Sequence, residues 1–406
     1  MRPFLAALAV ALAATSPAAT ATDYHVLTSI LSGYQNHSTC SVGACTDYVP
    51  GLRMTGAFTT AAPIVSPGAD LATSVVSFSF TDGINTWSSA DPNVRISQFQ
   101  VAVDAGGRPT TMVMILHRWQ TAGPHAAGAR LDVLSLGPGI AGVAANLGCS
   151  AVGVHPTTAI PDFCTATASD TNTSQAGASF YQRFAVGAPV PVPPFQPTTY
   201  TFGGPAYGSF VNHTACAVGT CGDFDATMRV TGTMTTFEPL PPGLAAQLMN
   251  GIVAAYAFSD GLTTYDSTDP QVREGFVFFG TDGFGVPSDT LFVLMRWQQG
   301  AGPHAPGDRA DVLQISGPTV QGGKNINCPT VDVFVITGEA DFCGIAPDSG
   351  TSIATGTGIG GWSGPPRSVV PVPGPAGRAL VLLATLVALA GAIASRRRAP
   401  VAARAR

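Results

Sequence analysis

The chain has 406 residues, of which 45% are hydrophobic and only 11% are Asp, Glu, Lys or Arg, and its formal net charge is −5. Lys324 is the only lysine, and all 24 acidic residues lie between Asp23 and Asp348. This composition argues against a nucleic-acid-binding protein, which needs clustered Lys and Arg, and against polybasic binding to anionic lipid.

The N-terminus has the pattern of an export signal. Met1-Arg2-Pro3 is a short basic region, residues 4–14 are apolar, and Ala19-Thr20-Ala21 is a small-x-small cleavage sequence. We expect residues 1–21 to be removed as a signal peptide, so that the chain from Thr22 onward is exported. The exported part is long enough for two domains with hydrophobic cores.

The exported part contains one unit written twice. An Asn-His-x-x-Cys motif begins at Asn36 and again at Asn212, and the offset between the copies drifts only from 176 to 179 residues. Two long copies indicate tandem duplication of a domain rather than a solenoid, which needs shorter and more numerous units. We predict β-domains over residues 22–187 and 200–364, joined by a Pro-rich linker over residues 188–199.

Strand patterns dominate both copies. Residues 75–80 and 253–258 are strand-like, and each is followed by Asp-Gly, the preferred pair of a two-residue type I′ hairpin. Residues 112–119 and 291–297 are continuous apolar runs, which predict central strands buried on both faces. A helical pattern occurs over residues 243–250. We expect each copy to be an antiparallel β-sandwich or a flattened barrel of about seven to nine strands.

The cysteines predict disulfides. There are eight, an even number, behind an export signal. Four cysteines per copy allow three pairings, and we favour the local one because a Gly in each short Cys-x4-Cys loop permits the tight turn. The predicted bonds join Cys40 to Cys45, Cys149 to Cys164, Cys216 to Cys221 and Cys328 to Cys343.

Two patterns suggest metal ions. His37 and His213 each precede the first cysteine of a copy by three residues, as zinc ligands can, but structural zinc sites usually space their thiolates more closely. Aspartates on the predicted turns offer oxygens that suit Ca²⁺, although Asx turns explain them without a metal and the spacing matches no EF-hand. These residues are Asp82, Asp91, Asp260 and Asp269. We predict no cofactor, with Ca²⁺ as the alternative.

Histidines raise the question of catalysis. His125 and His304 each follow Gly-Pro, and Asp132 and Asp311 follow seven residues later. A histidine with a carboxylate can act as a general base. No serine or cysteine nucleophile in an elbow accompanies either pair, and Gly-Pro-His after a strand is typical of a turn. We therefore predict that the chain is not an enzyme.

The exposure of the aromatic residues distinguishes a structural role from carbohydrate binding. Arg-Trp pairs end the most apolar strand of each copy, and neighbouring residues on a strand face opposite sides. We favour a core Trp beside an Arg paired to Asp132 or Asp311. Binding of a sugar requires instead that aromatic side chains are exposed at matching places in the two copies. The residues concerned are Arg118, Trp119, Arg296 and Trp297, together with Trp87 and Tyr265.

The C-terminal tail has the pattern of a membrane anchor. Residues 379–394 are 16 residues without a charge, about 24 Å of helix. Arg396, Arg397 and Arg398 follow, so the positive-inside rule places the C-terminus in the cytoplasm. We predict a Pro/Gly-rich spacer over residues 365–377, and a transmembrane helix with its arginine cluster over residues 378–398.

The tail resembles the C-terminal sorting signals of bacterial exosortase substrates, the PEP-CTERM class. The resemblance rests on Val370-Pro371-Val372-Pro373, the apolar run and the arginine cluster, with Val372 where that family has Glu. It implies a variant signal whose helix an exosortase-type membrane protease removes; a plain C-terminal anchor is the alternative.

The resemblance also implies a location and a role. We expect an exported protein of the cell membrane, cell surface or extracellular matrix, with no catalytic activity. Its expected partners are the membrane, the sorting protease and extracellular polysaccharide. The alternative is a pair of carbohydrate- or ligand-binding modules.

Overall fold

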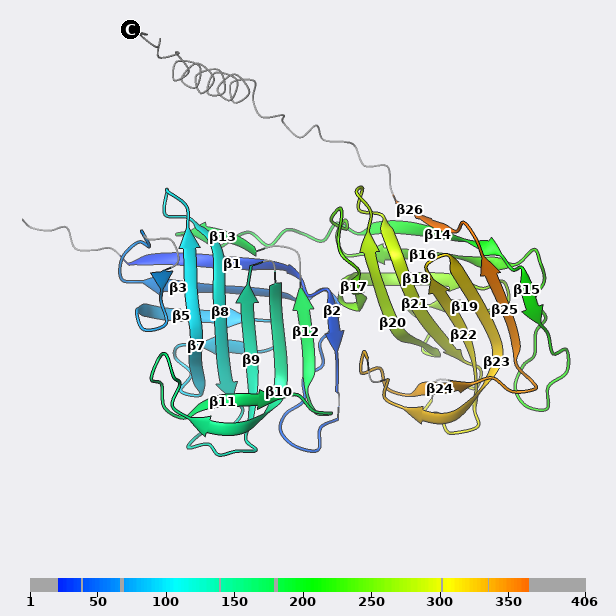
Figure 1. The fold of residues 1–406 in the computed structure, drawn as a ribbon, viewed down its shortest axis with the longest axis horizontal. Coiled ribbons are helices and arrows are strands. Elements are labelled where there is room, and N and C mark those ends of the chain that lie inside the picture. The colour runs from blue at the N-terminus through cyan, green and yellow to red at the C-terminus, as the bar shows by residue number, and fades with distance from the viewer. Residues whose placement is uncertain are drawn as a thin grey trace, which may run out of the picture. The chain divides into compact units, whose positions relative to one another are not determined.

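Both copies of the duplicated unit consist of β-strands in the computed structural model (Figure 1). The structure describes residues 21–37, 39–65, 69–138, 140–178, 182–300, 302–334 and 336–364. Within these ranges, no helix is long and apolar enough to cross a membrane. Residues 1–20 of the predicted signal peptide, the sorting motif at 370–373, the transmembrane helix and the arginine cluster lie outside the described residues.

The first copy forms two antiparallel sheets. The smaller has the strand order β13-β1-β3-β5-β6, and the larger has the order β2-β12-β10-β9-β8-β7-β4, with β11 paired to β10. The strands are β1 (Thr22–Ile30), β2 (Gly33–Gln35), β3 (Arg53–Thr60), β4 (Ala69–Asp70), β5 (Val75–Thr81), β6 (Thr86–Ser88), β7 (Val94–Val103), β8 (Pro109–Trp119), β9 (Arg130–Gly137), β10 (Ile140–Gly153), β11 (Phe163–Ala168), β12 (Ser174–Ala178) and β13 (Gln182–Val186).

The second copy repeats this topology. Its sheets have the orders β19-β18-β16-β14-β26 and β15-β25-β23-β22-β21-β20-β17, with β24 paired to β23. The strands are β14 (Thr198–Ala206), β15 (Ser209–Val211), β16 (Arg229–Thr236), β17 (Gln247–Leu248), β18 (Val253–Ser259), β19 (Thr264–Asp266), β20 (Val272–Thr281), β21 (Pro287–Trp297), β22 (Arg309–Ser316), β23 (Thr319–Asp332), β24 (Phe342–Ala346), β25 (Ser352–Thr357) and β26 (Gly361–Ser363). The repeat in the sequence is therefore a repeat of the fold.

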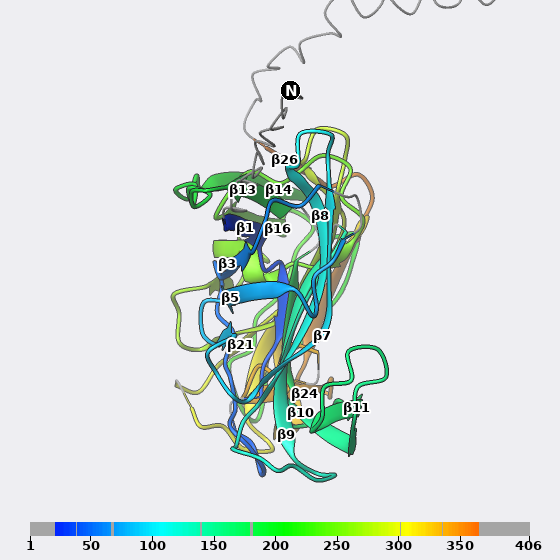
Figure 2. The same cartoon turned by 90° about the vertical axis from the view of Figure 1, so that its left-hand side faces the viewer.

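Each copy is a β-sandwich with its core between the two sheets. In Figures 1 and 2 the strands of the smaller sheet run across those of the larger one, the arrangement of crossed sheet packing. Phe58 and Phe80 of the smaller sheet pack with Phe99, Met114 and Leu116 of the larger. Among the described residues, each copy has a five-stranded and an eight-stranded sheet, more than the seven to nine strands expected, because short edge strands such as β2 and β4 add to the count.

The apolar runs are central strands, but only one of their faces is fully buried. In β8, Met112, Met114 and Leu116 are 0% exposed, whereas the alternate residues Val113 and Ile115 are half-buried. The prediction of burial on both faces is therefore wrong. Only the inner face of the larger sheet meets the second sheet of the sandwich, and β21 shows the same alternation.

The Asp-Gly hairpins form, but with a longer turn than predicted. Thr81 pairs with Thr86, so the loop is the four residues 82–85 rather than two. The carboxylate of Asp82 accepts hydrogen bonds from the backbone N–H of Ile84 (2.8 Å) and Asn85 (2.6 Å), an Asx turn. Asp260 holds the second copy's loop in the same way.

The helix predicted over residues 243–250 is absent from the described structure. The segment contains β17, which pairs with β20, and is followed by a 3₁₀ turn, η1 (Asn250–Ile252). Leu244 donates its N–H to Thr281 Oγ1 at 2.9 Å, and its carbonyl accepts from the N–H of Thr281 at 3.0 Å. These long-range bonds replace the bonds that a helix would make.

Candidate functional site

All eight cysteines are paired in disulfides. The bonds join Cys40 to Cys45, Cys149 to Cys164, Cys216 to Cys221 and Cys328 to Cys343. This is the local pairing that the sequence favours. Cys149 and Cys164 are at most 2% exposed and pack with Trp119 and Leu131, whereas Cys40 lies in a partly exposed loop.

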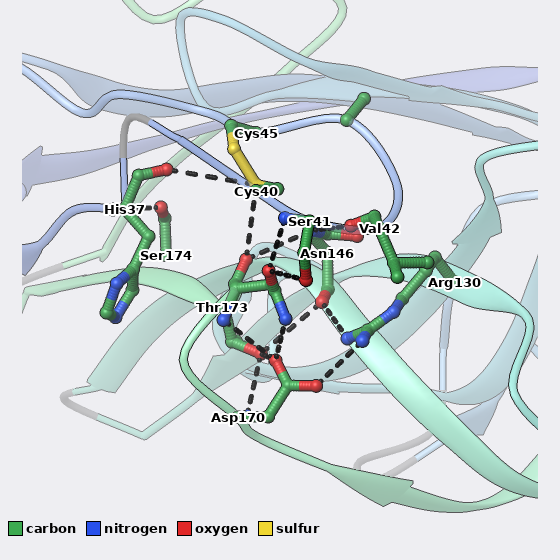
Figure 3. The surroundings of a disulfide bond; sticks show 12 residues. His37, Cys40, Ser41, Val42, Cys45, Arg130, Asn146, Asp170, Thr173 and Ser174 are labelled. Carbon is green, nitrogen blue, oxygen red and sulfur yellow. Dashed lines mark hydrogen bonds and ion pairs between the residues drawn. A yellow bond between two sulfur atoms is a disulfide. The ribbon is translucent and has the colours of Figure 1, made fainter.

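The Cys40–Cys45 loop rests on a polar network (Figure 3). Asn146 donates its side-chain amide to the carbonyl of Val42 at 2.8 Å. Arg130 donates to the carbonyl of Asn146 at 3.0 Å and to the carboxylate of Asp170 at 2.7 Å. In the second copy Asn325, Arg309 and Asp348 repeat these bonds beneath the Cys216–Cys221 loop. The shared residues therefore serve the fold of each copy.

The glycine in each disulfide loop is required for this docking. Gly43 has φ +79°, and a Cβ there would lie 2.0 Å from Asn146 Oδ1. Gly219 has φ +81° and meets Asn325 Oδ1 at the same distance. A side chain would thus be strained by the backbone and would also clash with the asparagine.

The zinc alternative finds no support in this arrangement. Cys40 and Cys45 are bonded to each other, and Figure 3 shows the ring of His37 pointing away from their sulfur atoms. His37 is held through its backbone N–H, which donates to Ser174 Oγ at 2.8 Å. His213 makes the same backbone bond to Ser352. Both histidines are therefore loop residues beside a disulfide.

The Gly-Pro-His segments form a second repeated cluster. The rings of Trp119 and His125 stack with centroids 4.1 Å apart, and His125 Nδ1 lies 2.7 Å from Asp162 Oδ2. Trp119 Nε1 donates to the carbonyl of Asp162 at 3.0 Å. Trp297, His304 and Asp341 repeat the cluster with distances of 4.0, 2.7 and 3.0 Å. The carboxylate that meets each histidine is thus Asp162 or Asp341, not the Asp132 or Asp311 that the sequence suggested.

This geometry gives His125 no free nitrogen for base catalysis. Its Nδ1 faces the carboxylate of Asp162, and its Nε2 lies 2.8 Å from the carbonyl of Thr121. The side chain is 2% exposed. Because a carbonyl oxygen can only accept a hydrogen bond, Nε2 carries a proton and has no lone pair with which to take one from a substrate. The cluster instead links the loop after β8 to the start of β11 as a staple.

The carboxylate of the staple is held in its charged form. Burial opposes ionisation, but the hydrogen bonds from the backbone and ring of His125 outweigh it and lower the pKa of Asp162. Arg95, 3.4 Å from the carboxylate, adds to the effect. The same balance lowers the pKa of Asp341 beside His304 and Arg273.

A serine and a histidine also meet in the first copy, beside a cavity of about 440 Å³. Ser97 Oγ lies 3.3 Å from His155 Nε2, and the backbone N–H of Thr158 donates to His155 Nδ1 at 3.0 Å. Because Nδ1 accepts this hydrogen bond, Nε2 carries a ring proton and donates a hydrogen bond to Ser97 Oγ. His155 therefore does not activate Ser97.

The aromatic residues proposed for sugar stacking are all in the core. Trp87 and Tyr265 are 0% exposed, and Trp119 and Trp297 are at most 1% exposed. None of the four presents a ring face to solvent. The core position that we favoured for the Arg-Trp pairs is therefore the observed one.

The two buried aspartates have different cationic partners. Asp132 lies 3.7 Å from Arg118, as predicted, and burial raises its pKa. Asp311 is 0% exposed and accepts a 2.6 Å hydrogen bond from Lys324, not from Arg296 as predicted. Arg296 bonds Asp269 instead, at 2.9 Å.

The turn aspartates use their oxygens within the protein. Asp91 accepts from the N–H of Asn93 at 2.9 Å and lies 3.4 Å from Arg118. Asp269 accepts from the N–H of Gln271 at 2.9 Å. Among the residues that the structure describes, no group of three or more His, Cys, Asp or Glu side chains is arranged to hold a metal ion.

The two copies meet at a joint between the chain around β2 and the segments around η1 and Gly338. Asn250 accepts from the N–H of Tyr34 at 3.0 Å and donates its side-chain amide to the carbonyl of Tyr34 at 3.1 Å. The N–H of Gly251 donates to the carbonyl of Ser32 at 3.0 Å, and the N–H of Asn36 to that of Thr337 at 2.9 Å. The joint is thus made largely of backbone groups.

Two glycines allow the backbone segments of the joint to approach each other closely. A Cβ on Gly251 would lie 2.1 Å from the carbonyl oxygen of Leu31, and one on Gly338 would lie 1.5 Å from that of Asn36. The matching positions in the other copy are Thr73 and Ala159. These two close approaches therefore depend on glycines that only the second copy has at these positions.

A pocket of about 650 Å³ lies at this joint and is lined by both copies. Tyr34 comes from β2, Tyr256 from β18, Glu274 from β20 and Glu339 from the segment before β24. Burial, followed by the charge of Glu339, raises the pKa of Glu274 to about 8. Burial also raises the pKa of Glu339, against the opposing effect of Arg273, whose Nε lies 3.8 Å away.

Sequence reasoning missed this pocket because it concentrated on residues that the copies share. At the positions that match the four polar residues, the other copy has Phe210, Phe78, Ile96 and Ile160. A search for positions that are polar in one copy and apolar in the other would have found them. Comparison with protein-family models, curated proteins and solved structures finds no match to the chain.

Proposed function

We propose that the chain is an exported bacterial surface or extracellular-matrix protein with a structural or binding role and no catalytic activity. Its C-terminal segment would act as a sorting signal of the exosortase type, with the motif at 370–373, the helix and the arginine cluster as the three parts. The membrane and a sorting protease would be its partners during export.

The observation that carries this proposal is the set of four disulfides, which includes every cysteine of the chain. Disulfides form and persist in oxidising compartments outside the cytosol. The repeated polar clusters support a structural role, because their side chains bond one another or the backbone and leave the two copies with the same fold. An extracellular polysaccharide remains the proposed neighbour of such a protein in a matrix.

Intact mass and cell fractionation of the native protein test the proposal. A species that begins near Thr22 and ends near Pro373, released from the membrane or carrying an adduct, is expected. Deletion of residues 370–406 should release the protein without that processing. A species that retains Arg396–Arg398 in the membrane would mean a plain anchor and would overturn the sorting proposal.

A second candidate function is ligand binding, and the pocket at the joint favours it. The four aromatic residues first considered for sugar binding are in the core, so this candidate no longer rests on them. It rests on a pocket of the size that small ligands occupy, lined by residues of both β-sandwiches. Binding measured on the full chain, as described below, tests it.

A further inference from the structure

The joint pocket contains polar groups that the protein itself does not satisfy. Tyr256 is 8% exposed, and no described residue forms a hydrogen bond with its hydroxyl. The hydroxyl of Tyr34 is likewise without a partner among the described residues. Neither hydroxyl is sealed in the protein interior; both side chains line the pocket, so the hydroxyls are available to a molecule bound there.

The duplication supplies an internal comparison for these groups. Phe78 occupies the position of Tyr256 in the first copy, and Phe210 occupies the position of Tyr34 in the second. The fold is the same in both copies, so it does not need either hydroxyl. The same holds for Glu274 and Glu339, which Ile96 and Ile160 match. Four independent differences thus place acceptor atoms at one pocket.

The electrostatics of the pocket favour a positively charged occupant. Asp47, Glu274 and Glu339 are among its lining residues, and none of the described lining residues is Lys or Arg. Both glutamates line the pocket, and the charge of Glu339 raises the pKa of Glu274, so a cation that enters would offset this unfavourable interaction.

The size of the pocket favours an organic cation over a metal ion. Ca²⁺ needs six to eight oxygens at 2.3–2.6 Å, and a space of about 650 Å³ is far larger than one ion. An ammonium group has three donors and no acceptor, which matches carboxylates and hydroxyls. Tyrosine rings also attract cations through their faces.

We propose that the joint pocket binds a primary ammonium group on an organic molecule, with the carboxylates of Glu274 and Glu339 neutralising its charge and the two tyrosine hydroxyls accepting its hydrogen bonds. This inference rests on the ligand-binding candidate and not on the sorting proposal. Two sources present this chemistry outside a cell, polyamines and amino sugars.

Isothermal titration calorimetry on the purified full chain in detergent micelles tests the proposal. The probes are spermidine, glucosamine, N-acetylglucosamine and CaCl₂. Binding of spermidine alone assigns the site to polyamines, binding of glucosamine alone to amino sugars, and binding of both to the ammonium group itself. N-acetylglucosamine has the same ring without the charge and should not bind.

Variants that introduce the other copy's residue locate the binding. E274I and E339I should each weaken binding about 10- to 100-fold, the range for a charged hydrogen bond, and Y256F about 3- to 10-fold. D47N changes a residue that lines the pocket, and its matched control is D223N, which changes the exposed residue at the equivalent position of the second copy. D223N should leave the affinity unchanged. A melting curve of each variant without ligand verifies that it is folded.

Several results would overturn the inference. Binding of CaCl₂ without either amine would show a metal site instead. If N-acetylglucosamine binds and the amines do not, the ligand-binding candidate would stand, but the proposal that the pocket recognises an ammonium group would be wrong. If E274I, E339I and Y256F all bind as the unmodified chain does, the ligand sits elsewhere. Absence of binding by all four probes would remove both the inference and the ligand-binding candidate, while the sorting proposal would stand on its own test.

Discussion

The side-chain amide of Asn250 pairs with the backbone of Tyr34 as a neighbouring strand would. It accepts from the N–H at 3.0 Å and donates to the carbonyl at 3.1 Å, so that one side chain of the second copy satisfies both backbone groups of a residue in the first. Ala72 occupies the matching position in the other copy and can make neither bond. Arg53 and Glu238, 3.1 Å apart, add an ion pair across the same joint.

The joint should make the two copies unfold together. Replacement of Gly251 by Thr, the residue of the first copy, places a Cβ against the carbonyl oxygen of Leu31. We expect a loss of about 1–3 kcal/mol from this overpacking and a split of one calorimetric transition into two. G203T is the control, because nothing lies within 4 Å of a Cβ at that position. If G251T unfolds in a single transition at an unchanged temperature, the joint does not couple the unfolding of the two copies.

The staple predicts a pH-dependent contribution to stability. Hydrogen bonds lower the pKa of Asp162 in the folded state, so its contribution is present above its unfolded pKa of about 3.9 and is lost as the pH falls through the folded value. D162N should therefore cost about 1–3 kcal/mol at pH 7, and the difference from the unmodified chain should shrink toward pH 2. Urea unfolding at several pH values measures it. A difference that does not change with pH would exclude the charge as its cause.

Lys324 should stabilise the fold by neutralising the buried carboxylate of Asp311. Replacement of Lys324 by Ala, the residue at position 145 of the first copy, removes the ammonium group 2.6 Å from a carboxylate that is 0% exposed. The neutral donors that remain, such as Gln298 at 2.6 Å, do not balance its charge. Loss of one partner of a buried ion pair costs about 3–5 kcal/mol. Urea unfolding should show this loss for K324A and a partial recovery for K324A/D311N. If the double variant is no more stable than the single one, the uncompensated charge is not the reason.

The disulfides should differ in their resistance to reduction. Cys149, Cys164, Cys328 and Cys343 are at most 2% exposed, whereas the cysteines of the two short loops are partly exposed. A mild phosphine reductant followed by alkylation should label Cys40, Cys45, Cys216 and Cys221 first in the folded chain, as read by peptide mass. Earlier labelling of Cys149 or Cys164 would contradict the order.

Removal of a buried disulfide should be costly. The C149S/C164S double variant is expected to lose about 3 kcal/mol on the chain-entropy model, with C40S/C45S as the comparison for a short loop. Urea unfolding of both variants measures the difference. Equal losses would mean that loop length does not control the effect.

The sequence by itself determined the features that depend on short separations. The duplication, the strands over residues 75–80, 112–119, 253–258 and 291–297, the positions of the Asp-Gly hairpins and the pairing of cysteines 5 or 15 residues apart all follow from local pattern and spacing. Local pattern failed for the turn length after Thr81, because the Asp82 carboxylate takes two backbone N–H groups and extends the loop to four residues.

Only the tertiary structure decided which groups meet across long separations. His125 meets Asp162, 37 residues away in the sequence, rather than the nearer Asp132 that we predicted. Asp311 likewise pairs with Lys324 rather than with Arg296. Tyr34 and Asn250 are 216 residues apart. Such pairings depend on the order of strands in the sheets and on the packing of the two copies. Neither the strand order nor this packing can be read from local sequence patterns, because both depend on contacts between residues far apart in the chain.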